Sequence, residues 1–160
     1  MVDSDSGTQE TGAPTSGASP VDETSARRLE IIRKGLGGRT EPVRRDASAE
    51  EVESWMRAAA AAAAAKTDAP TIVLDVGEVL GITTWFVITS AGNTRLVKTI
   101  VDVIEEEVDK MGGPKPLRVE GTDSYEWVVV DYGDFVVHAF LEEVRGFYEL
   151  ERLYRDVPVV

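Results

Sequence analysis

The stretch that decides the fold is WVVVDYGDFVVH, residues Trp127 to His138. Two apolar runs rich in β-branched residues flank the connection Tyr132-Gly133-Asp134. A short connection that contains glycine, set between two such runs, is typical of a tight hairpin. The sequence therefore predicts two antiparallel strands here.

Alternation along the first of these strands separates its side chains into two sets. Val128 and Val130 point to one face, while Trp127, Val129 and Asp131 point to the other. With the two valines turned towards helices, Trp127 lies on the opposite face of the sheet. A tryptophan on an uncovered sheet face is a natural interface anchor. The alternative is that Trp127 packs under a helix or loop of its own domain.

Outward from the hairpin, the pattern predicts three further strands and three helices. The strands are expected at residues 71–76, 85–89 and 116–119, and the helices at about residues 48–66, 94–111 and 142–155. A capping box of Ser48 and Glu51 opens the first helix, and Asn93 or Thr94 caps the second. The last helix is expected to bury Val144, Phe147, Tyr148 and Leu150 or Leu153. The order α-β-β-α-β-β-β-α predicts an α+β fold, a small mixed β-sheet with packed helices.

Composition predicts one domain and a tail. Residues 1–45 are expected to be a disordered tail with a basic segment at residues 27–45, and the folded domain is expected at residues 46–160. That basic segment is either a tail with a transient helical turn or a loose contact to an anionic surface. Residues 47–160 hold 10 of the 17 basic and 21 of the 29 acidic residues, so the domain body is expected not to bind nucleic acid directly. The absence of an apolar span predicts no membrane contact and a cytoplasmic location.

Residues with catalytic or metal-binding chemistry are few. The chain has no cysteine and one histidine, His138, which is expected to be a hydrogen-bonded histidine within its strand. Asp131 and Asp134 could hold magnesium against phosphate oxygens, but both flank a tight turn, where Asp commonly bonds nearby backbone N–H groups. We expect no catalytic residue, no metal site and no cofactor.

From Thr71 to Tyr154 the chain resembles the Iojap-like ribosomal silencing factors. The resemblance is carried by WVVVDYGDFVVH at residues 127–138, LDV at residues 74–76, VEG at residues 119–121 and FYELERLY at residues 147–154. It implies a nucleotidyltransferase-like fold without enzyme activity. The implied action is binding to the large ribosomal subunit through its ribosomal protein fourteen, which blocks joining of the small subunit and represses translation under nutrient limitation.

The resemblance also implies which residues bind the ribosomal protein. They lie on and just beyond the strand that bears the tryptophan: Trp127, Val129, Asp131 and Tyr132. Some members of the family form homodimers when free. Two alternatives stay open, a large-subunit assembly factor and a nucleotidyltransferase-like enzyme that uses Asp131 and Asp134.

Overall fold

A computed structural model of the protein describes residues 20–43 and 45–160. The chain divides into two units, which meet between Lys34 and Gly35. The described part of the first unit is residues 20–34, all of which belong to helix α1 (Pro20–Gly35). Its last turn carries Arg33 and Lys34, whose positive charges interact favourably with the negative end of the helix dipole.

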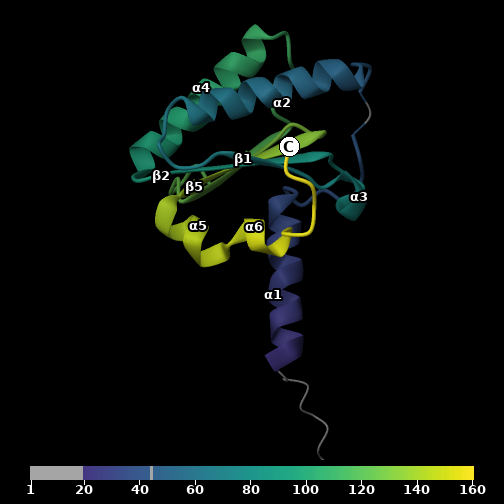
Figure 1. The fold of residues 1–160 in the computed structure, drawn as a ribbon, viewed down its shortest axis with the longest axis vertical. Helices are drawn as coiled ribbons and strands as arrows, with labels where there is room; N and C mark the ends of the chain where they lie inside the picture. The colour runs from purple at the N-terminus through teal and green to yellow at the C-terminus, as the bar shows by residue number, and fades with distance from the viewer. Residues whose placement is uncertain (1–19, 44) are drawn as a thin grey trace, which may run out of the picture. The chain divides into compact units, whose positions relative to one another are not determined.

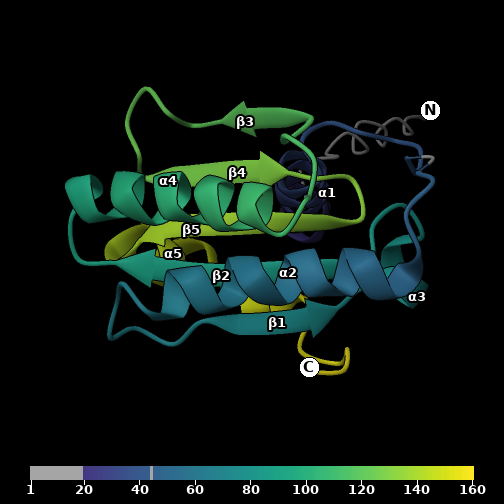
Figure 2. The same cartoon turned by 90° about the horizontal axis from the view of Figure 1, so that it is seen from above.

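The second unit is built on a five-stranded mixed sheet with the order β1-β2-β5-β4-β3. Its strands are β1 (Ile72–Asp75), β2 (Trp85–Ala91), β3 (Arg118–Glu120), β4 (Trp127–Asp131) and β5 (Phe135–Leu141). Strands β2 and β5 pair in parallel at the centre, and all the other pairs are antiparallel. Figure 2 shows this order across the sheet.

Helices α2 (Ala49–Ala64) and α4 (Thr94–Lys110) lie side by side over one face of the sheet (Figures 1 and 2). Both expected caps are present, because Ser48 and Glu51 form a capping box and Asn93 accepts a hydrogen bond from the Leu96 N–H. The alanines Ala59, Ala62 and Ala63 of α2 are buried in the core. Val128 and Val130 belong to the core beneath these helices, as the alternation predicted.

The opposite face of the sheet is covered by α5 (Glu142–Tyr148) and α6 (Leu150–Leu153) (Figure 1). These are two short helices, where the sequence predicted one continuous helix. Glu149 between them has a left-handed backbone with φ 47°, which ends the first helix and redirects the chain. Leu150 is buried as expected, but Phe147 is exposed, so the prediction that Phe147 is buried was wrong.

The mixed sheet with packed helices and the predicted order of its main elements are confirmed. Short helix α3 (Gly77–Leu80), between β1 and β2, was not predicted. The described residues include no helix long and apolar enough to cross a membrane.

The N-terminal boundary differs from the expected one. The second unit begins at Gly35 rather than at residue 46, and residues 20–35 form a helix where a disordered tail was expected. We call residues 35–43 together with Arg45 the strap. Its arginines were expected in a tail because their partners, Asp131 and Asp134, lie about ninety positions further along the chain. Residues 1–19 and Arg44 lie outside the described residues, so the disorder expected for residues 1–19 stays a prediction.

Candidate functional site

Trp127, at the start of β4, lies in an aromatic cluster on the sheet face opposite α2 and α4. Its ring is 4.9 Å from that of Phe140 and 4.8 Å from that of Tyr148, which belongs to α5. Its indole N–H donates a hydrogen bond of 3.2 Å to Nδ1 of His138. The side of β4 was therefore predicted correctly, and α5 covers it.

The expectation that Trp127 is exposed was wrong, because the residue is only 4% exposed. Val129, Asp131 and Tyr132 are each 1% exposed. Trp127 and Val129 are covered because their face of the sheet is apolar, so the last part of the chain folds back over it. Asp131 is instead covered by Arg39, and the Tyr132 ring lies in the core on the other face. The alternative that Trp127 packs under its own domain is the one the structure supports. A partner cannot contact these four side chains directly unless the residues that cover them move. Otherwise it contacts only the covering residues.

His138 is fully buried in the same cluster, with its ring 4.6 Å from Phe86. The hydrogen bond from Trp127 confirms the expected hydrogen-bonded histidine. Since Nδ1 accepts that bond, the neutral ring carries its proton on Nε2, which has no partner among the described residues. Burial lowers the pKa of His138 to about 3, so the ring stays neutral across the physiological range.

Asp131, at the end of β4, accepts two hydrogen bonds from one edge of the Arg39 guanidinium. Nε of Arg39 lies 2.8 Å from one carboxylate oxygen and Nη2 lies 3.1 Å from the other. The same guanidinium also donates to the carbonyl oxygens of Ile82 and Gly133, each at 2.9 Å. This bidentate pair joins the strap to the hairpin, and it is almost entirely shielded from water.

Asp134, across the turn, pairs with the second arginine of the strap. Nε of Arg45 lies 2.6 Å from the Asp134 carboxylate, and Nη2 donates to the carbonyl oxygen of Tyr132. The Tyr132 side chain points to the other face of the sheet, where its ring stacks on Phe135 at 4.7 Å. Burial, reinforced by Glu105 and Asp109, raises the pKa of the Tyr132 phenol. Tyr132 therefore does not share a surface with the other three predicted residues.

The two aspartates behave as turn residues. One oxygen of Asp131 accepts the Gly133 N–H at 2.8 Å, which is the local bond that the turn interpretation predicted. Each carboxylate is also paired with an arginine. Within residues 20–43 and 45–160, no group of three or more acidic or histidine side chains is placed to hold a metal ion.

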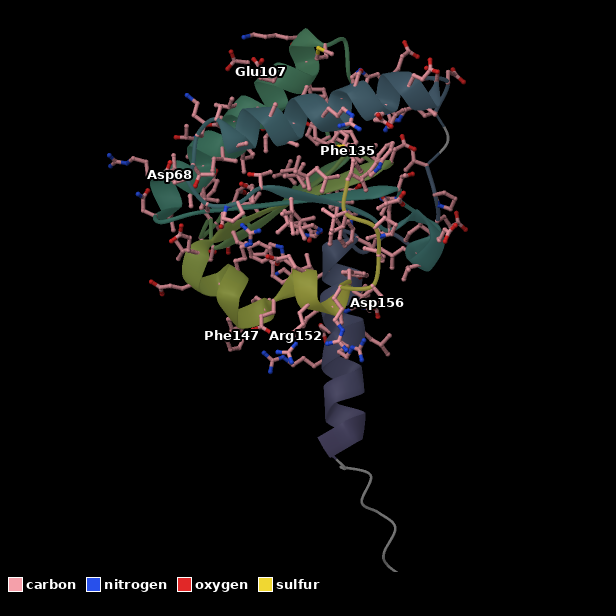
Figure 3. The ribbon with its side chains drawn as sticks, in the orientation of Figure 1. Asp68, Glu107, Phe135, Phe147, Arg152 and Asp156 are labelled. Atoms are coloured by element: carbon pink, nitrogen blue, oxygen red, sulfur yellow. The ribbon has the colours of Figure 1, made fainter. Side chains whose placement is uncertain are left out.

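Phe147 is the exposed feature that the sequence interpretation missed. It is 65% exposed on α5 and points away from the sheet (Figure 3). Its ring meets that of Tyr148 at 5.0 Å, and Tyr148 in turn packs on Trp127. An aromatic path therefore runs from the buried start of β4 to the surface. No local signal marks Phe147 as exposed, because an apolar residue at helical spacing is ordinarily expected on the buried face.

Comparison with known proteins shows the family of the chain. The family model described as "Ribosomal silencing factor during starvation" matches residues 48–160. A ribosomal silencing factor from Bacillus subtilis is 33% identical over 107 residues, which cover 67% of this chain and 90% of that protein.

Two further relatives extend the comparison. A mouse protein named for mitochondrial assembly of the ribosomal large subunit is 33% identical over 84 residues, covering 51% of this chain and 37% of that protein. A crystal structure of a protein from Chromobacterium violaceum superimposes with a TM-score of 0.61 at 27% identity, covering 65% of this chain and 86% of that one.

Proposed function

The chain belongs to the family of ribosomal silencing factors that act during starvation, and we propose that it binds the large ribosomal subunit and keeps the small subunit off. The contact is made through ribosomal protein fourteen of the large subunit, and the result is repression of translation under nutrient limitation. The observation that carries the proposal is the family match, which spans the whole of the layered domain from α2 to the C-terminal residue.

Charge supports a basic protein partner. Residues 47–160 hold 10 basic and 21 acidic residues, so this part of the chain is strongly negative. Ribosomal proteins are generally basic, and complementary charge speeds encounter and suppresses wrong partners. The same charge opposes direct binding of the domain body to ribosomal RNA. On this proposal the protein works in the cytoplasm, where free large subunits are found.

The proposed contact surface follows β4. The Trp127 end reaches the surface through Tyr148 and Phe147, and the Asp131 end lies at the turn beneath the strap. Exposed glutamates at positions 142, 143 and 149 flank Phe147. An exposed aromatic ring within an acidic rim suits a basic partner, because aromatic anchors commonly dominate binding energy. Val129 and Tyr132 then act as buried supports.

We propose that the protein acts by occupying a surface rather than by catalysis. The only aspartate pair that the sequence offered for magnesium is engaged by Arg39 and Arg45, and the chain lacks a glycine-rich phosphate cradle near it. Steric exclusion requires only a stable domain with one surface that binds the large subunit.

A second candidate function is assistance in assembling the large subunit. The name of the mouse relative favours it. Both candidates require binding to the large subunit, and they differ in whether joining of the small subunit is blocked.

The binding proposal is tested by co-sedimentation with purified large subunits, comparing wild type with Phe147→Ala. Loss of a central aromatic anchor commonly costs ~2 kcal/mol, which is roughly a thirtyfold weaker affinity. Met111→Ala is the matched control, since Met111 is a large exposed apolar residue at the end of α4, in the opposite layer. Equal binding by the two variants would remove Phe147 from the contact surface, and no binding by the wild type would overturn the proposed function.

A further inference from the structure

The turn between β4 and β5 is built to receive arginine side chains. Four acceptors at the turn bind two guanidinium groups: the carboxylates of Asp131 and Asp134 and the carbonyl oxygens of Tyr132 and Gly133. The carbonyl oxygens of Ile82 and Glu41 also accept hydrogen bonds from Arg39. Planar guanidinium groups suit such sites, because their N–H donors form a rigid fork that matches a carboxylate. Lysine, a flexible point charge, would not reproduce this geometry.

The strap is shaped to bring its arginines onto this turn. Gly37 has φ +65°, and a Cβ atom there would lie 3.1 Å from a carboxylate oxygen of Asp131. Gly35 lies against His138, where a Cβ atom would be 3.3 Å from the ring. Gly133 allows Val43 a similarly close approach. The close fit depends on these glycines, since larger residues would hold the strap away.

The strap also lies outside the part of the chain that matches the family. The family match begins at residue 48, after Arg45, whereas the turn that accepts the arginines lies inside it. The receiving site therefore lies inside the matched part of the chain, and the segment that fills it lies outside that part. Two cations supplied by the strap cover the acidic end of β4, where a basic partner would otherwise meet it.

We infer that the strap is an autoinhibitory segment, and that Arg39 and Arg45 occupy an arginine-binding site that the basic partner on the large subunit uses. This inference rests on the proposed function. The partner and the strap compete for the same acceptors, so the affinity of the chain for large subunits is reduced by the fraction of molecules in which the strap is seated.

The test uses the full chain and purified large subunits. The double variant Arg39→Gln/Arg45→Gln removes both guanidinium groups, and we expect it to bind at least about threefold more tightly than wild type. Gly37→Ala loosens the strap without changing any charge, and we expect it to tighten binding as well. The matched control is Arg57→Gln/Lys98→Gln, which removes two positive charges from exposed ion pairs on α2 and α4 and should leave the affinity as in wild type.

Each outcome decides a different point. Tighter binding by both strap variants, with the control unchanged, supports autoinhibition. Unchanged or weaker binding by Gly37→Ala, with a cooperative thermal melt, overturns it, and weaker binding by the double variant would show that the arginines contact the ribosome themselves. An equal gain in affinity in the double variant and in the control variant would show that net charge causes the effect, and it would overturn autoinhibition. If neither wild type nor any variant binds, the proposed function fails, and the inference fails with it.

Discussion

A single hydrogen bond links two residues that the sequence had assigned separate roles. Trp127 donates to His138 inside an aromatic cluster, which holds the histidine in one neutral form. The imidazole is fully buried, and it cannot gain a charge without losing that bond, since Nδ1 would then carry a proton. The folded state therefore opposes protonation strongly.

This opposition makes stability depend on pH. The pKa of His138 is about 3 in the folded chain, against an ordinary value of 6.5. Because the unfolded chain takes up the proton first, stability is full above the unfolded pKa and falls as the pH drops below it. Between about pH 6.5 and about pH 5, where few carboxylates titrate, we expect a loss of about 1 to 2 kcal/mol.

Urea unfolding at several pH values in this window measures the effect. His138→Gln keeps an acceptor for the Trp127 N–H and removes the titrating ring, so its stability should vary much less with pH. If the free energy of unfolding falls equally with pH in wild type and variant, another group causes the acid destabilisation.

At the scale of elements, the backbone of the connection between β3 and β4 lies very close to the start of β4. Gly121 has φ +91°, and a Cβ atom there would lie 2.1 Å from the carbonyl oxygen of Trp127. No side chain can be accommodated without moving the start of β4, which also positions the aromatic cluster.

Gly121→Ala is therefore expected to cost about 2 to 4 kcal/mol of stability, through backbone strain and a steric clash. Gly146→Ala is the matched control, because Gly146 lies in α5 and a Cβ atom added there would meet no other atom within 4 Å. That control should be neutral or stabilise the domain by up to about 1 kcal/mol, the usual gain from alanine in a helix. Thermal or chemical unfolding of both variants distinguishes them, and similar stabilities would contradict the close approach.

Sequence patterns predicted the elements whose signal is local. The hairpin around Gly133, the capping box at Ser48 and the apolar stripe of α4 all appear where periodicity and turn chemistry indicated them. The break at Glu149 was missed, since a left-handed glutamate carries no local signal. The strap was missed for a different reason, because Arg39 and Asp131 are 92 positions apart. The exposure of Trp127 was mispredicted because alternation gives the side of a strand and not what covers it.

At the scale of the domain that begins at Gly35, one layer is structural and the other carries the proposed function. Helices α2 and α4 close the core on one face of the sheet, and their exposed ion pairs keep the outer side of that layer hydrated. The opposite face holds the aromatic path to Phe147 and the Arg39–Asp131 pair. Silencing by steric exclusion requires that this second face meets the large subunit and stands in the way of the small one.

The most direct measurement is ribosome formation followed by sucrose-gradient sedimentation, started once from separated subunits and once from preformed paired ribosomes. We expect the protein to prevent joining of separated subunits, to co-migrate with the large subunit and to leave preformed ribosomes intact. Equal effects on both starting materials, or unimpaired joining by large subunits that carry the protein, would contradict steric exclusion.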